Sequence, residues 1–181
     1  MYGRLRMNRK LIIAIVGKSG TGKTTLGRYL SKHLHYNWIC SYTTREMREG
    51  EIDGIDHKFV NESDMPDKKD MMAYTKFANN HYWTTFDQFD EILPNVYVID
   101  EKGLIEMESM IVSNRLNYDL LKVFVDRKDI DVDKDRQKRD EERESLPECY
   151  YDIVLRNDCD LKTFLENSTR EINEVVNLIR N

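Results

Sequence analysis

Residues 11–24 read LIIAIVGKSGTGKT, an apolar run followed directly by a glycine-rich turn. The apolar run, residues 11–16, is short, continuous and rich in β-branched side chains, which is typical of a strand buried on both faces. Residues 17–24 fit the pattern G-x-x-x-x-G-K-[ST]. Glycines let the backbone turn tightly, so that successive amide N–H groups point into one anion-sized hollow. The stretch therefore predicts a strand, a phosphate-binding loop and a helix, in that order.

This loop pattern predicts ligands for a nucleoside triphosphate. Lys23 can reach the β- and γ-phosphates as a catalytic residue, and the Thr24 hydroxyl can hold Mg²⁺. The helix that follows presents its positive N-terminal end to the same phosphates. The alternative is a turn that matches by chance, which composition alone produces in on the order of one chain of this length in a hundred. The flanking strand and helix argue against chance. The predicted ATP-binding residues are Gly17, Lys18, Ser19, Gly20, Thr21, Gly22, Lys23, Thr24 and Thr25.

Strands and helices alternate along the rest of the chain. Apolar residues recur at helical spacing from Leu26 and again from Leu104 to Val112, and a final helix is expected after Asp160 with Leu161 on its buried face. Thr85 and Gln88 have the spacing of a capping box. Short strands are expected at residues 37–40, 57–60, 71–77, 81–84, 96–100, 121–125 and 151–155. This alternation predicts an α/β fold with a parallel, doubly wound sheet, interrupted by an inserted segment at about 41–90.

Length and composition fit one globular domain. The chain has 181 residues and a net charge of -5, which argues weakly against a nucleic-acid binder. Its apolar runs are far shorter than the ~20 residues needed to cross a bilayer, and the basic start followed by six apolar residues lacks a cleavage pattern. Three cysteines without C-x-x-C spacing favour a reducing cytoplasm over a disulfide framework or a zinc site.

An acidic residue ends the strand expected at residues 96–100. Asp100 follows four apolar residues, and an acid at this place can orient Mg²⁺ through water. The alternative is a residue that caps the next helix. Both roles are compatible, so Asp100 is predicted as a second metal-site residue beside Thr24.

A second motif resembles a known family. Residues 41–56 read SYTTREMREGEIDGID and closely resemble the signature of guanylate kinases, which is approximately S-x-T-T-R-x-x-R-x-G-E-x-x-G-x-D-Y-x-F. The resemblance continues in weaker form through Tyr82, the strand before Asp100 and residues 151–158. It implies a P-loop NTPase-type parallel sheet flanked by helices, with a small inserted nucleoside-monophosphate-binding lobe and a short lid. The implied boundaries are a core at 1–40 and 91–181, a lobe at about 41–90 and a lid at about 127–147, all within a single domain.

The resemblance also implies roles for the acceptor. Arg45, Arg48 and Tyr82 would hold the acceptor phosphate, and two guanidiniums three residues apart can fork onto one phosphate. Ser41 and Thr84 would contact the base. The alternative for the arginines is surface pairing with Glu46, Glu49 and Glu51. The predicted acceptor-binding residues are Ser41, Arg45, Arg48, His57, Tyr82, Thr84 and Asp100.

Three positions depart from the family pattern. His57 stands where the family has a phosphate-binding tyrosine, and imidazole can also donate to a phosphate; the alternative is an ordinary surface histidine. Ala73 stands where a family glutamate accepts two hydrogen bonds from guanine, so guanine preference is expected to weaken. Trp83 replaces a small residue beside the base site, where it can reshape the pocket.

The lid is expected in a highly charged segment. By resemblance, Arg136 and Arg139 would act as catalytic residues on the transferring phosphoryl group, and their spacing places them on one helical face. The alternative is a solvated helix held by pairs such as Asp135 with Arg139, each worth about 0.3–0.5 kcal/mol.

These observations predict ATP-dependent phosphoryl transfer to a nucleoside monophosphate, with GMP, dGMP or a related purine nucleotide as acceptor and Mg²⁺ as cofactor. Small-molecule nucleotides are the expected partners of a monomer or homodimer, with no nucleic acid and no membrane. Two alternatives stay open. One is a P-loop ATPase or a kinase for a non-nucleotide acceptor, and the other is a non-catalytic guanylate kinase-like module that binds proteins.

Overall fold

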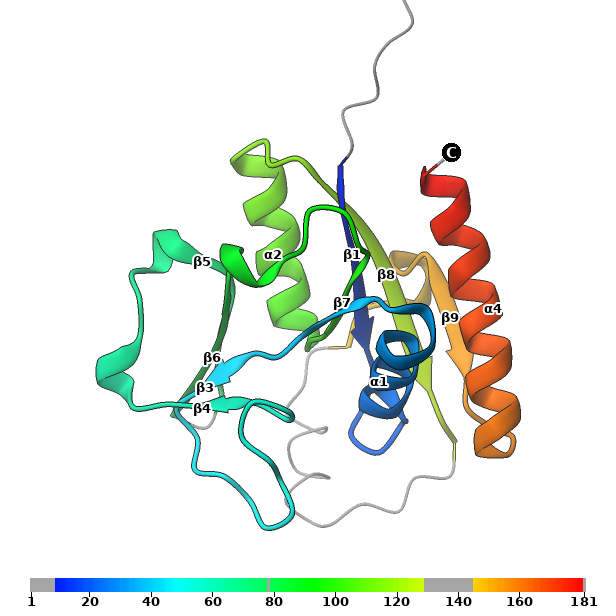
Figure 1. Ribbon diagram of the computed structural model, residues 1–181, viewed down its shortest axis with the longest axis horizontal. Helices are drawn as coiled ribbons and strands as arrows, with labels where there is room; N and C mark the ends of the chain where they lie inside the picture. The colour runs from blue at the N-terminus through cyan, green and yellow to red at the C-terminus, as the bar shows by residue number, and fades with distance from the viewer. Residues whose placement is uncertain (1–8, 78, 129–144, 181) are drawn as a thin grey trace, which may run out of the picture.

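The computed structural model describes residues 9–77, 79–128 and 145–180 (Figure 1). A five-stranded sheet forms its centre, in the order β2-β7-β1-β8-β9, and all neighbouring strands pair in parallel. The strands are β1 (Lys10–Val16), β2 (Asn37–Ile39), β7 (Asn95–Val98), β8 (Tyr118–Asp126) and β9 (Ile153–Arg156). The predicted α/β class and parallel sheet are confirmed.

Helices cover both faces of this sheet, as Figure 1 shows. They are α1 (Lys23–Leu34), α2 (Glu101–Ser113) and α4 (Leu161–Arg180). Alternate residues of β1 explain the arrangement: Ile13 and Ile15 pack with α1 and α4, whereas Ile12 and Ala14 pack with α2. The strand is apolar throughout because each face meets a helix layer.

A second, four-stranded sheet lies beside the first, in the order β4-β3-β6-β5. It is built from β3 (Tyr42–Thr43), β4 (Lys58–Phe59), β5 (Met71–Phe77) and β6 (Asn80–Thr85). Short 3-10 helices flank the strands: η1 (Glu62–Asp64), η2 (Lys68–Asp70) and η3 (Phe86–Gln88), with η4 (Glu148–Tyr150) before β9. Strand β5 and helix α2 pack together, so the second sheet leans on the central one.

Local capping signals in the sequence are confirmed. Thr85 and Gln88 form both bonds of a capping box at η3. Asp100 caps α2, and the Asp160 carboxylate accepts the Thr163 N–H at the start of α4. Leu161 is 57% exposed, however, so its predicted place on the buried face is wrong. Leu161 is the first residue of α4, and the buried residues of this helix begin at Phe164.

Candidate functional site

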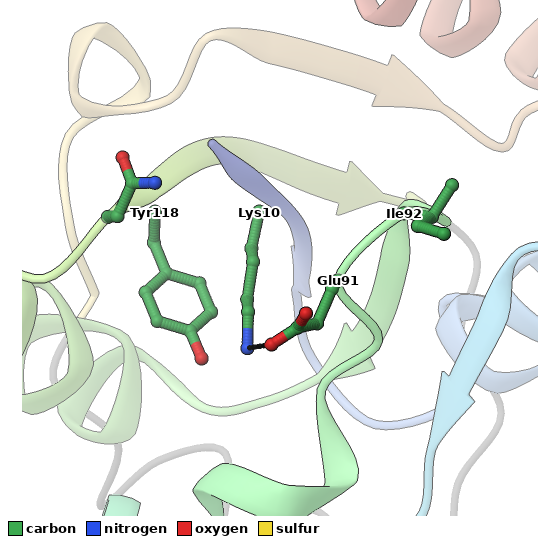
Figure 2. Close-up of a pocket in the computed structure, with 5 residues that line it drawn as sticks. Lys10, Glu91, Ile92 and Tyr118 are labelled. Carbon is green, nitrogen blue, oxygen red and sulfur yellow. Dashed lines mark ion pairs between the residues drawn. The ribbon is translucent and has the colours of Figure 1, made fainter. Parts of the chain in front are cut away.

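One open hollow among the described residues lies away from the predicted phosphate loop. It encloses about 500 Å³ and is lined by Lys10, Glu91, Ile92, Asn117 and Tyr118 (Figure 2). The Lys10 ammonium lies 3.2 Å from the Glu91 carboxylate and near the Tyr118 ring. Lys10 begins β1, so the hollow is at the amino end of the sheet. Ligands in open parallel sheets bind at the carboxyl ends of the strands, which directs attention to the opposite edge.

Three glycines of the phosphate loop at that edge have positive φ values, and two of them also have close neighbours. Gly17, Gly20 and Gly22 have φ values of +150°, +76° and +102°. A Cβ on Gly17 would lie 2.2 Å from the Val125 carbonyl oxygen, and one on Gly22 would lie 2.8 Å from Asn157 Nδ2. Both the backbone conformation and the close contacts therefore require glycine.

Asn157, which follows β9, fastens this loop. Its Nδ2 donates to the Thr21 carbonyl at 2.8 Å, and the bond is buried. The Thr21 hydroxyl in turn donates to the Lys18 carbonyl at 2.9 Å. Sequence reasoning assigned no role to Asn157. Its only signal was its place in the weakly matching segment 151–158.

Groups suited to phosphate surround the loop. Lys23 Nζ donates to the Lys18 carbonyl at 2.6 Å, so its side chain folds over the loop. Thr24 and Thr25 are exposed in the first turn of α1. Within residues 23–34, that turn carries no acidic side chain, and Gly22 makes no side-chain cap bond. The positive end of α1 is thus available to an anion.

The register of the central sheet brings Asp100 to the same edge. Ile15 on β1 is opposite Val98 on β7, and the Ile99 N–H donates to the Ile15 carbonyl at 3.1 Å. Asp100 therefore follows its strand at the level where Gly17 follows β1. Its Oδ1 accepts the Gly103 N–H at 2.7 Å, which confirms the capping alternative and uses one of its two carboxylate oxygens.

Arg45 in the inserted segment is held by a carboxylate. Its two terminal nitrogens donate to the two Glu51 oxygens at 2.9 and 2.8 Å, and the Arg45 side chain is only 10% exposed. Glu51 also accepts the Arg48 N–H at 2.8 Å. Burial lowers the pKa of Arg45, but its hydrogen bonds to Glu51 outweigh the effect of burial and raise that pKa above its usual range. Arg45 thus pairs with Glu51, as the alternative prediction had it. This pairing orients the Arg45 guanidinium over the Phe59 ring.

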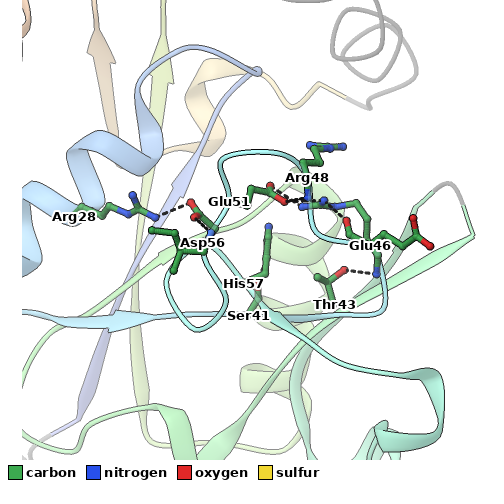
Figure 3. A network of polar contacts seen from close by, with 10 residues as sticks. Arg28, Ser41, Thr43, Glu46, Arg48, Glu51, Asp56 and His57 are labelled. Atoms are coloured by element: carbon green, nitrogen blue, oxygen red, sulfur yellow. Dashed lines mark hydrogen bonds and ion pairs between the residues drawn. The ribbon is translucent and has the colours of Figure 1, made fainter.

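His57 and Ser41 contact each other beside this pair (Figure 3). Ser41 Oγ lies 2.9 Å from His57 Nδ1, and the His57 ring meets Tyr82 edge-on at 5.9 Å. Partial burial lowers the pKa of His57, Arg45 lowers it further, and Glu51 opposes the shift. His57 is therefore no ordinary surface histidine, since three predicted acceptor-binding residues surround it.

Of the two predicted base contacts, Thr84 lies on β6, whereas Ser41 directly precedes β3. Ala73 on β5 is opposite Thr84 on β6, so both point to one face. The Thr84 hydroxyl is buried and has no well-formed hydrogen bond to any described residue. Trp83 points to the other face, where it stacks on Tyr42 at 5.5 Å. Trp83 therefore packs away from Thr84 instead of lining the same pocket.

Two contacts tie the inserted segment to the core, one at helix α1 and one at strand β2. Arg28 on α1 donates to Asp56 at 2.7 Å (Figure 3), and Trp38 Nε1 donates to the Ile55 carbonyl at 3.4 Å. The loop with Arg45 and His57 is thus positioned relative to the loop with Lys23.

Arg136 and Arg139 lie outside the described residues, so the structure does not place them. The flanks of their segment are described. Arg156 at the end of β9 donates to Asp126 on one flank and to Glu148 on the other. No group of three or more metal-ligating side chains is found among the described residues, and none of the described helices is long and apolar enough to span a membrane.

The sheet order, the glycine loop and the acid at the next strand end define an α/β phosphate-binding protein of the P-loop class. A family model of guanylate kinases matches residues 8–176. The chain therefore belongs to the guanylate kinase family.

Individual relatives agree with this membership. The chain is similar to guanylate kinases of Clostridium tetani (33% identity over 109 residues, 56% of this chain and 52% of that one) and Chlorobium luteolum (28% over 145 residues, 75% and 71%). It spans about half the length of most of the curated relatives it matches. A crystal structure of guanylate kinase from Anaplasma phagocytophilum shares the fold, with a TM-score of 0.62, 17% identity, and 96% of this chain and 87% of that chain covered.

Proposed function

We propose that this chain transfers the γ-phosphoryl group of ATP to a nucleoside monophosphate, with GMP, dGMP or a related purine nucleotide as acceptor. The position of Arg45 is the observation that supports this proposal most strongly. Arg45 is oriented by Glu51, and its loop is bonded through Asp56 to Arg28 of α1, the helix that begins at the phosphate loop. In this reaction the γ-phosphate and the acceptor phosphate, both anions, must come into contact. The reaction therefore requires a cationic group beside each of them.

The phosphate loop fits a nucleoside triphosphate. A Cβ at Gly17 or Gly22 would collide with the neighbouring Val125 and Asn157, and the exposed first turn of α1 offers N–H groups to phosphate oxygens. Lys23 would move from the Lys18 carbonyl to the β- and γ-phosphates. The Thr24 hydroxyl and the Asp100 carboxylate have the oxygen chemistry that Mg²⁺ prefers. When bound there, Mg²⁺ would neutralise phosphate charge.

The second sheet would serve as the acceptor-binding lobe. Arg45, Arg48, Tyr82 and His57 would hold the acceptor phosphate, and Ser41 and Thr84 would meet the base. Glu51 uses only part of the donor capacity of Arg45, because a guanidinium carries five N–H groups. Arg45 is thus oriented in advance and can still donate to a phosphate.

The residues present suffice for the transfer without a general base. The attacking oxygen of a monophosphate is already anionic, so catalysis consists of alignment and charge stabilisation. Lys23 would stabilise charge on the transferring group, and we propose the same role for Arg136 and Arg139. Closure of the lobe would exclude water, which otherwise competes as acceptor. The three free cysteines suit a reducing cytoplasm as the setting of this reaction.

The test is ADP release measured with ATP and Mg²⁺ against GMP, dGMP, AMP, CMP, UMP and dTMP. Lys23→Ala serves as the blank and Lys32→Ala, an exposed change later in α1, as the matched control. We expect turnover that depends on a purine monophosphate, is lost in Lys23→Ala and persists in Lys32→Ala. ADP release that no acceptor stimulates would instead support an ATPase or a kinase for another acceptor. A chain that binds no ATP would support the protein-binding module.

A further inference from the structure

A direct contact joins the predicted base-binding and phosphate-binding residues. Ser41 Oγ and His57 Nδ1 are 2.9 Å apart, and the Lys58 N–H donates to the Ser41 carbonyl at 2.9 Å. The backbone bond fixes the two segments in register, so the side-chain contact is held by the sheet. Ser41 is buried at 8% exposure, which leaves its hydroxyl few alternative partners.

The other end of the imidazole faces the predicted phosphate site. Because Nδ1 is at Ser41, Nε2 is on the far side of the ring, and Figure 3 shows the ring pointing toward Glu51. Phe59 and Tyr82 contact the ring edge-on at 5.8 and 5.9 Å and hold its plane. A phosphate held by Arg45 would therefore lie within reach of Nε2.

Burial, with Arg45 acting in the same direction, lowers the pKa of His57 and favours the neutral ring near pH 7 before a phosphate binds. The titratable and charged groups that face it are Arg45, Glu51 and Asp56 from its own loop and Tyr82 from β6. These two lowering effects outweigh Glu51, Asp56 and the Ser41 backbone, all of which raise the pKa of His57. In the neutral ring, Nδ1 can either accept from the Ser41 hydroxyl or donate to it, depending on the tautomer.

A bound phosphate dianion removes this ambiguity. Negative charge beside Nε2 favours the protonated imidazole, in which both ring nitrogens are donors. Nδ1–H must then donate to Ser41 Oγ, and the Ser41 hydroxyl hydrogen is left to donate elsewhere. The direction of the hydrogen bond between Ser41 and His57 is thereby linked to phosphate binding at the other nitrogen of the same ring.

Resting on the proposed function, we propose that His57 takes up a proton from solvent when the acceptor phosphate binds and thereby turns Ser41 into a donor toward the base. The site then favours a base that presents an oxygen acceptor, as the 6-oxopurines do, over the 6-amino group of adenine. A hydrogen-bond donor in the site discriminates between bases because a base without a matching acceptor leaves that donor unpaired. His57 is in this account a phosphate ligand that also determines specificity.

Calorimetry tests the proton uptake. Binding of GMP and of guanosine is measured at pH 7.0 in buffers of different ionisation enthalpy, with the wild-type chain and His57→Gln. At this pH roughly nine-tenths of a free nucleotide phosphate is already dianionic, so the ligand itself contributes little. We expect proton uptake with GMP, none with guanosine, and none with GMP in His57→Gln. The wild-type comparison of GMP with guanosine needs no variant.

Turnover tests the link to the base. The ratio of kcat/KM for GMP to that for AMP is expected to fall about tenfold from pH 6.5 to pH 8.5 in the wild type and to be independent of pH in His57→Gln. Ser41→Ala should lose this selectivity while keeping the proton uptake. GMP binding without proton uptake, or unchanged selectivity in Ser41→Ala, would overturn the inference and leave the proposed function standing. Absence of any nucleotide-dependent turnover would overturn both.

Discussion

The Asn157 side chain donates to the Thr21 carbonyl at 2.8 Å across 136 residues of sequence. This bond connects the last strand of the central sheet to the loop that begins after its first strand. The loop is thus held at one end by β1, at the other by α1, and between them by a distant amide.

Asn157→Ala is expected to weaken both folding and nucleotide binding. The Thr21 carbonyl would remain buried without its partner, at a cost of about 1–3 kcal/mol in the free energy of unfolding. Urea unfolding measures the loss, and ATP titration should show a raised Kd. Asn177→Ala, an exposed change on α4, is the control and should alter neither quantity. Equal stability of the two variants would contradict the role given to Asn157.

Substitutions at two glycines distinguish the effect of a close contact in the phosphate loop from the effect of backbone strain alone. Gly22 and Gly50 both have positive φ values, +102° and +82°, but only a Cβ on Gly22 meets a neighbour, at 2.8 Å from Asn157 Nδ2. Gly50→Ala should therefore cost about 1–2 kcal/mol of stability. Gly22→Ala should additionally abolish ATP binding measured by titration. Retained binding in Gly22→Ala would show that the loop tolerates a side chain there.

Glu51→Gln should affect the acceptor more than the donor nucleotide. The charge that orients Arg45 would be lost, so we expect KM for the monophosphate to rise about tenfold while KM for ATP stays within about twofold. Glu46→Gln is the matched control, because Arg45 contacts only the backbone carbonyl of that residue. A similar rise in both Michaelis constants would indicate general damage to the fold.

The same pair predicts a pH dependence of stability. Burial raises the pKa of Glu51, but bonds from Arg45 and the Arg48 N–H outweigh it, and the folded pKa lies below the usual 4.5. A carboxyl group whose pKa is lower in the folded than in the unfolded state stabilises the fold at pH values above its unfolded-state pKa. This contribution is lost as the pH falls through the folded-state pKa. Between about pH 6 and pH 3, the wild type should therefore lose more unfolding free energy than Glu51→Gln. Parallel curves from urea titrations would contradict the pairing.

Ala73 predicts weak discrimination at the base. It shares a face with Thr84 but offers no polar atom, so GMP and IMP should differ less than about tenfold in kcat/KM. Ala73→Glu should raise the preference for GMP, at a cost in stability because position 73 is buried among apolar side chains. A strong preference for GMP in the wild type would mean that other groups read the 2-amino position.

Local patterns carried most of the fold prediction. The apolar run before Gly17, the capping box at Thr85 and the cap at Asp160 each act over a few residues, and each is found where expected. Helix faces were less predictable. The apolar spacing from Leu104 to Val112 indicates one buried stripe, yet Val112 is 70% exposed, because the packing partners of a helix decide which edge of its apolar face is covered.

Long-range contacts in the site could not be read from the sequence. The pairing of Arg45 with Glu51 depends on the backbone turn that brings the two side chains together, and it is compatible with the proposed phosphate binding. Asn157 and Thr21 are linked only through the sheet register. The contact of Ser41 with His57 depends on the pairing of β3 with β4, two strands of two residues each that no periodicity specifies.

Transfer of label from [γ-³²P]ATP is the most direct test of the central claim. The chain is incubated with Mg²⁺, labelled ATP and GMP, and the products are separated, with Lys23→Ala in parallel. The account predicts that the label appears in GDP, only when GMP is present and only with Lys23 intact. Label released as inorganic phosphate at the same rate with and without GMP would contradict it.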